Sequence, residues 1–109
     1  MRTIHHPAAD ELDLAEVLHA LSDPVRLTVV RNLALTGEGP CGGLSCEVSK
    51  STLSHHLKVL REAGVTRTRA EGTQRLLSLR RTELDSRFPG LLEAVLASAN
   101  GTDRSAGVS

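Results

Sequence analysis

Aromatic residues are almost absent from this sequence of 109 residues, because Phe88 is the single Phe and there is no Trp or Tyr. Proteins that recognise single-stranded RNA or DNA usually stack bases on aromatic rings, so the composition weighs against that class. A duplex is recognised through its grooves and phosphates, and it stays compatible with the composition.

Long apolar runs are missing too. No stretch approaches the roughly 20 apolar residues that span a bilayer, and residues 1–13 contain no apolar signal segment. We therefore expect a cytoplasmic protein without membrane association.

Enzyme motifs are also missing. The chain has neither a glycine-rich phosphate loop with its lysine nor a Gly-x-Ser-x-Gly sequence. No pair of carboxylates is placed at a credible cleft, and the adjacent Ser54 and His55 point in different directions on a helix. We expect neither catalysis nor a cofactor.

The net charge is zero, but the charges are unevenly distributed. Residues 50–81 hold eight basic and two acidic side chains, whereas residues 1–49 hold three basic and seven acidic ones. Affinity for a nucleic-acid backbone depends on where charges lie rather than on their sum. The basic stretch is typical of a phosphate-binding surface, and a solvated charged face is the plainer alternative.

The length predicts one domain with a thin core. We expect a flexible tail over residues 1–9, a folded domain over 10–99 and a disordered tail over 100–109. Apolar spacing and capping residues predict helices at 10–21, 25–35 and 49–64, and at 82–99 either one helix or two pieces broken near Pro89 and Gly90. The residues expected to face the core include Leu14, Val17, Leu18, Leu21, Leu27, Val30, Leu35, Leu53, Leu57 and Leu60.

Two short strands are predicted at 65–69 and 75–79, joined by a glycine-centred turn. The glycine-rich segment 36–43 is typical of a loop or a strained short helix. A polar helix directly before a basic hairpin indicates a mainly α fold (α+β), a winged helix-turn-helix with a two-stranded β-wing.

This layout points to duplex DNA as the partner. Small hydrogen-bonding and basic side chains on the helix at 49–64 suit base edges and phosphates in a major groove. Arginines on the hairpin suit the DNA backbone or the minor groove. The expected DNA-binding residues are Lys50, Ser51, Thr52, Ser54, His55, Lys58, Arg67, Arg69 and Arg75.

Three segments resemble the ArsR-type (arsenic-repressor-like) bacterial transcriptional regulators. The sequence SKSTLSHHLKVLREAG at residues 49–64 resembles the family's recognition helix, residues 20–27 resemble its second-helix signature, and Glu71, Gly72 and Thr73 match its wing turn. The similarity covers about residues 12–97. It implies a homodimeric repressor that binds a two-fold operator and is released by a signal. It also implies a dimer interface on the first and last helices, here Leu14, Val17, Leu18, Leu92, Val95 and Leu96.

The sequence departs from the family at its metal sites. Many members bind metal through a Cys-x-Cys pair, whereas Cys41 and Cys46 are spaced C-x4-C, and residues 82–99 lack the histidines of a second family site. We expect no metal site at either of these family positions. Three roles for the cysteines stay open: buried small side chains, a reversible disulfide that acts as a redox sensor, or a thiophilic metal site completed by another ligand.

A second function stays open as well. The same fold could serve as a protein-interaction or dimerisation module that does not bind DNA, which the neutral total charge favours slightly. The basic stretch at 50–81 and the intact helix at 49–64 favour DNA more. The sequence does not identify the inducer, the operator or the regulated genes.

Overall fold

The computed structural model describes residues 6–40 and 49–98. Cys41, Cys46, the expected tail at 100–109 and the part of the glycine-rich segment 36–43 that follows Pro40 therefore lie outside the described residues. Among the described residues, no helix combines the length and the apolar character needed to cross a bilayer.

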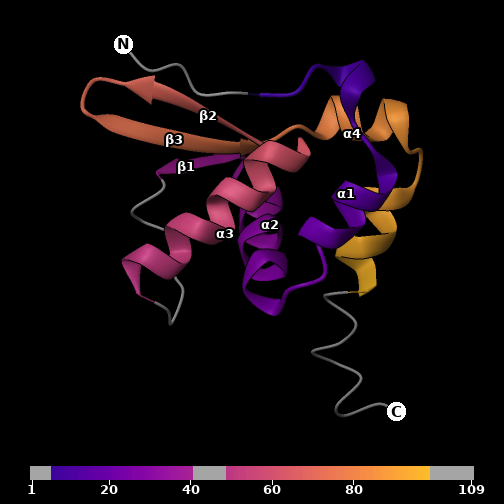
Figure 1. Cartoon of the computed structure of the whole chain (residues 1–109), viewed down its shortest axis with the longest axis horizontal. Coiled ribbons are helices and arrows are strands. Elements are labelled where there is room, and N and C mark those ends of the chain that lie inside the picture. The colour runs from indigo at the N-terminus through magenta and orange to yellow at the C-terminus, as the bar shows by residue number, and fades with distance from the viewer. Residues whose placement is uncertain (1–5, 41–48, 99–109) are drawn as a thin grey trace.

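The described elements form a winged helix-turn-helix (Figure 1). A short 3-10 helix, η1 (Ala9–Glu11), precedes α1 (Leu14–Ala20), α2 (Pro24–Thr36), β1 (Glu38–Pro40), α3 (Lys50–Ala63), β2 (Thr66–Glu71), β3 (Gln74–Leu79) and α4 (Arg81–Arg87). A further helical segment covers residues 91–98. The expected fold class is confirmed, and the last helix is in two pieces, with Gly90 between them at φ 84°.

Capping aspartates decide where the first two helices begin. Asp13 accepts a hydrogen bond from the Glu16 amide at 3.1 Å, so α1 begins at Leu14 and not at Asp10 as predicted. Asp23 accepts from the amides of Val25 and Arg26 at 2.8 and 3.2 Å, and Pro24 occupies the first turn of α2.

Both ends of α3 match the sequence prediction. The Ser49 hydroxyl accepts from the Thr52 amide at 3.2 Å, and Gly64 ends the helix in the left-handed conformation at φ 88°. A Cβ on Gly64 would collide with the side chain of Leu12, so two separate constraints favour glycine at this position.

The sheet has three strands in the order β1-β3-β2, both pairs antiparallel. The hairpin of β2 and β3 is the predicted wing, with Thr66 opposite Leu79 and Glu71 opposite Gln74. The prediction of a loop or helix from residue 36 onward was wrong for β1, which pairs Glu38 with Ser78. Glycine and proline have low strand propensity, so the pairing with β3 is a tertiary effect.

The core lies between the helices and the inner face of the sheet. Its fully buried side chains include Val17, Val29, Val30, Leu33, Leu60, Val65, Leu77 and Leu92. Leu35 was expected in this core but is 79% exposed, and Leu14 and Leu18 are each 46% exposed. α2 therefore buries the neighbouring positions Val29, Val30 and Leu33 instead of Leu35.

The segment before α1 packs on the wing and on α4. Pro7 is buried and its carbonyl accepts from Arg80 Nη1 at 2.6 Å, while His6 Nε2 accepts from the Thr68 amide at 3.1 Å. Arg87 Nη2 donates to the Leu12 carbonyl at 2.7 Å. Arg80 and the Thr68 amide thus contact residues 6 and 7, which belong to the segment expected to be a flexible tail.

Candidate nucleic-acid interface

The N-terminal part of α3 exposes a row of polar side chains. We call residues 50–55 the reading segment, and Lys50, Ser51, Thr52, Ser54 and His55 are all exposed there. The Ser49 hydroxyl lies 3.2 Å from the hydroxyl of Ser51 and 2.9 Å from that of Thr52. Hydroxyls, an imidazole and an ammonium group suit the donors and acceptors of base edges and the charge of phosphates.

The reading segment and the wing occupy the same end of the molecule. Figure 1 shows the N-terminal end of α3 and the turn of the β2–β3 hairpin at one end of the long axis. The helices α1, α4 and 91–98 lie toward the other end. A helix that enters a major groove and a hairpin that follows the adjacent backbone require this shared orientation.

Arg69, one of the expected DNA contacts, is paired within the chain. Its Nε and Nη2 donate to the two carboxylate oxygens of Glu38 at 2.8 and 2.9 Å, and Nη2 also donates to Glu71 at 3.1 Å. The hydrogen bond from Arg69 lowers the pKa of Glu38, and the bond to Glu38 raises the pKa of Arg69. The side chains stay 51% and 34% exposed, so a phosphate can compete for this guanidinium.

Arg67 is paired as well, with Glu83 on α4 at 3.1 Å. Glu83 also lies 3.9 Å from the buried Arg80. Burial raises the pKa of Glu83, but the hydrogen bonds from its own amide and from Arg67, with the charges of both arginines, lower that pKa overall. Burial and the nearby Arg67 charge lower the pKa of Arg80.

The other expected phosphate contacts differ in whether they form an ion pair within the chain. Lys58 lies 4.0 Å from Glu62 and remains 61% exposed. Lys50 and Arg75 are exposed and form no ion pair within the described part of the chain. Sequence reasoning missed Glu38 and Glu83 as partners of Arg69 and Arg67, because they come from β1 and α4 and depend on how these elements pack against the hairpin.

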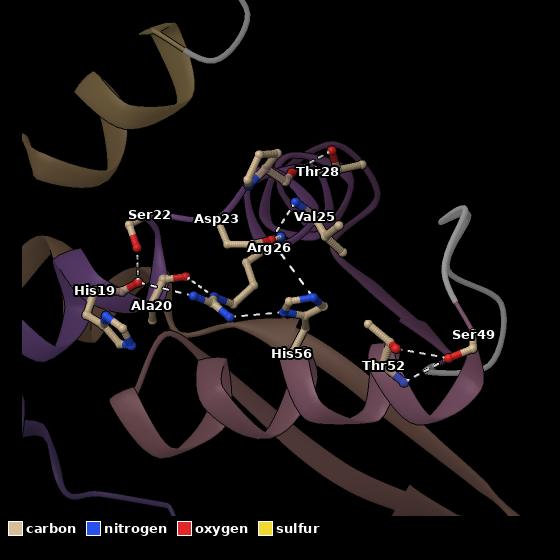
Figure 2. A network of polar contacts seen from close by, with 11 residues as sticks. His19, Ala20, Ser22, Asp23, Val25, Arg26, Thr28, Ser49, Thr52 and His56 are labelled. Carbon is tan, nitrogen blue, oxygen red and sulfur yellow. Dashed lines mark hydrogen bonds and ion pairs between the residues drawn. The ribbon is translucent and has the colours of Figure 1, made fainter.

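A buried polar network behind the reading segment was not predicted (Figure 2). Arg26 on α2 is 7% exposed, and its Nε donates to the Ala20 carbonyl at 2.6 Å. Its Nη1 lies 3.0 Å from Nδ1 of His56, which is 9% exposed on α3. His56 Nε2 faces Asp23 Oδ1 at 4.0 Å.

Asp23 also caps α2, and its pKa reflects both roles. Burial raises the pKa of this carboxyl, but the backbone hydrogen bonds from Arg26 and Val25 and the nearby Arg26 charge lower it overall. Asp23 thus combines a helix cap with a place beside the buried pair.

The expected dimer residues divide into two groups. Leu14 and Leu18 are 46% exposed on α1, and Val95 and Leu96 are partly buried against the core. Val17 and Leu92 are 0% and 1% exposed, so these two side chains pack in the core of the single chain. The helical spacing placed all these residues on apolar faces but did not separate the core side from the outer side.

In residues 6–40 and 49–98, no group of three or more His, Cys, Asp or Glu side chains is arranged to hold a metal ion.

Known proteins share both the sequence and the fold. A family model described as a helix-turn-helix domain matches residues 21–69. The HTH-type transcriptional regulator YceK of Bacillus subtilis (strain 168) is 40% identical over 90 residues, which cover 80% of this chain and 90% of YceK.

Solved structures give the same result. The transcriptional repressor BigR from Xylella fastidiosa is 34% identical with a TM-score of 0.56, over 69% of this chain and 85% of that one. A crystal structure of an ArsR family transcriptional regulator has a TM-score of 0.61 over 84% of this chain and 96% of its own, and its 22% identity supports the fold alone. By sequence, this chain belongs to the HTH-type transcriptional regulators, and its fold is the winged helix-turn-helix of an ArsR family regulator.

Proposed function

We propose that this regulator is a homodimeric repressor that binds a two-fold DNA operator and is released by a small signal, either a redox change or a ligand. The reading segment supports this most directly, because its exposed polar row shares one end of the molecule with the basic wing. The likeness to BigR, which is named a transcriptional repressor, supports the direction of regulation.

In this proposal, α3 lies in the major groove. Ser51, Thr52, Ser54 and His55 reach base edges, and Lys50 and Lys58 contact the adjacent phosphates. The wing lies along the backbone, which Arg67, Arg69 and Arg75 hold. For Arg67 and Arg69, phosphate replaces Glu83 and Glu38 as the partner.

The dimer in this proposal uses the outer face of α1. Leu14 and Leu18 are two large apolar side chains, one helical turn apart, that remain 46% exposed. Together with the partly buried Val95 and Leu96 they supply apolar area for a partner. A two-fold dimer places two copies of α3 on two successive half-sites of the duplex.

The signal in this proposal acts next to the reading segment. Cys41 and Cys46 lie in the sequence between β1 and α3, so their oxidation to a disulfide would alter the connection to α3. Each disulfide formed gives two electrons and two protons to the oxidant, and reductant reverses the step.

The test begins with selection of a duplex from a random-sequence pool by the wild-type protein. The selected duplex and a shuffled version are then titrated at near-physiological salt, first reduced and then after mild peroxide. The repressor and the redox signal are supported if the wild type binds tightly and selectively until it is oxidised. A Cys41→Ser variant should then keep this binding after peroxide. Selective binding that ignores peroxide assigns the release to a ligand.

A failure of selection has a separate meaning. If no duplex is enriched in either redox state, DNA binding is overturned and the fold acts as a protein-interaction module. The alternative then predicts a partner protein and early elution from heparin.

A further inference from the structure

The anchoring of α3 in the core is uneven along the helix. Its buried residues are His56, Leu60 and Ala63. His56 is therefore the buried residue closest to the reading segment, in which Leu53 alone is partly buried. The position of the reading segment thus depends on what His56 contacts.

His56 makes a directional contact. Arg26 Nη1 lies 3.0 Å from His56 Nδ1, and both side chains are buried. A guanidinium only donates, so Nδ1 accepts, which requires a neutral imidazole with its proton on Nε2. The Nε2 atom that carries this proton lies 4.0 Å from Asp23 Oδ1.

Arg26 is itself fixed from the opposite side. Its Nε donates to the Ala20 carbonyl at 2.6 Å and its Nη2 to the His19 carbonyl at 3.4 Å, both at the end of α1 (Figure 2). Its amide is held by Asp23 at the start of α2. The guanidinium is therefore a rigid bridge from the α1–α2 turn to α3.

We propose that the Arg26–His56 hydrogen bond sets the orientation of the reading segment, so that His56 is a positioning residue for DNA recognition that does not itself touch DNA. The apolar contacts at Leu60 and Ala63 are non-directional and allow the helix to roll or slide. A hydrogen bond from a buried cation has a narrow range of distance and angle. This inference rests on the proposed DNA binding by α3.

The main experiment compares two substitutions of the same residue. His56→Leu removes the acceptor and keeps an apolar side chain. In His56→Asn, the side-chain oxygen is attached to the same carbon as Nδ1 in histidine and can accept the same hydrogen bond. The probes are the duplex selected by the wild-type protein and its shuffled version.

We expect His56→Leu to bind the selected duplex about tenfold more weakly. Its affinity for the shuffled duplex and its salt dependence stay those of the wild type, because no phosphate contact is lost. His56→Asn keeps the affinity of the wild type. Wild-type affinity in His56→Leu overturns the proposal, and so does an equal loss in both variants when both are folded.

A second measurement needs no DNA. In the wild type, nitrogen NMR of His56 shows a proton on Nε2, and a proton on Nδ1 instead overturns the proposal. In His56→Leu, amide hydrogen exchange accelerates over residues 50–56 while the exchange of the core strands is unchanged. Unchanged exchange at residues 50–56 overturns the proposed role of His56. If the wild type selects no duplex, the proposed DNA function is overturned instead, and the exchange result still tests the role of His56.

Discussion

His55 and His56 are neighbours in the sequence with opposite surroundings. Their ring centroids lie 5.7 Å apart, yet His55 is exposed and His56 is 9% exposed. Successive helix positions point in directions about 100° apart, so one ring can face a ligand while the next faces α2. The pair thus serves two separate purposes, which single substitutions can distinguish.

Replacement of His55 by alanine tests direct base contact. We expect His55→Ala to weaken binding to the selected duplex by about 1–3 kcal/mol, because a base-edge hydrogen bond is lost. Binding to the shuffled duplex should change little. A fluorescence-anisotropy titration measures both affinities, and an unchanged affinity for the selected duplex would exclude the contact.

Replacement of Glu38 by glutamine tests the competition for Arg69. We expect Glu38→Gln to raise affinity for every duplex by up to about fivefold, because the weak, exposed ion pair would no longer hold the guanidinium. Arg69→Ala should weaken binding on all sequences and flatten the salt dependence.

The control is the same change in an Arg69→Ala background. There, Glu38→Gln has no guanidinium to release, and the gain should shrink to the effect of the removed charge alone. An equal gain in both backgrounds would show that Glu38 acts only through its charge.

Among the helices and strands, α3 has a C-terminal end with two separate constraints. Gly64 combines a φ of 88° with a Cβ position that collides with the side chain of Leu12. We expect Gly64→Ala to lower the free energy of unfolding by about 2–5 kcal/mol, the sum of backbone strain and overpacking.

Gly72 supplies the matched control for this change. It also has a positive φ, 63°, but open space around its Cβ position. Gly72→Ala should therefore cost only about 1–2 kcal/mol of backbone strain. Urea unfolding measures both variants, and equal losses would show that the contact with Leu12 contributes nothing.

Sequence alone predicted the elements whose signals are local. α3 carries its own cap, apolar spacing and terminal glycine, and the hairpin has alternation around a glycine turn. β1 has no such signal, because Glu38, Gly39 and Pro40 form a strand only by pairing with β3. The exposure of Leu35 was missed for the same reason: several stripes on α2 are apolar, and tertiary packing decides which is buried.

The candidate site divides in the same way. The exposed polar row of the reading segment follows from helix periodicity, and the structure exposes all five of its expected DNA-binding residues. Glu83 is 16 residues from Arg67, Glu38 is 31 residues from Arg69, and His56 is 30 residues from Arg26. Contacts at such separations follow from the packing of whole elements, which a single sequence does not display.

For the whole molecule, the lowered carboxyl pKa values predict sensitivity to acid. Asp23 and Glu83 have pKa values below their ordinary ones in the folded state. The folded state therefore binds fewer protons, so their contribution is present above the unfolded pKa and is lost as pH falls through the folded pKa. We expect the free energy of unfolding to decline below about pH 5.

Urea unfolding at several pH values measures this decline. Asp23→Asn keeps a good helix cap but removes one titrating carboxyl, so its stability should depend less on pH. A decline as steep as that of the wild type would assign the acid sensitivity to other groups.

The proposed dimer also concerns the whole molecule. We expect Leu14→Glu to shift the protein to monomers, because the dimer would bury an unpaired charge in its apolar interface. The desolvation penalty for such a charge is on the order of several kcal/mol. Sedimentation velocity measures the change. Leu35→Glu, at a side chain 79% exposed at the end of α2, is the control and should leave the assembly unchanged. Dimers that persist in Leu14→Glu would place the interface elsewhere.

The contact of the N-terminal segment with the wing has a consequence for solubility. β2 is an edge strand of the sheet, and the unpaired amides of an edge strand are a template for another chain. His6 accepts a hydrogen bond from one of these amides, that of Thr68, from 62 residues away. His6 therefore blocks part of an edge at which two molecules could otherwise join their sheets and aggregate.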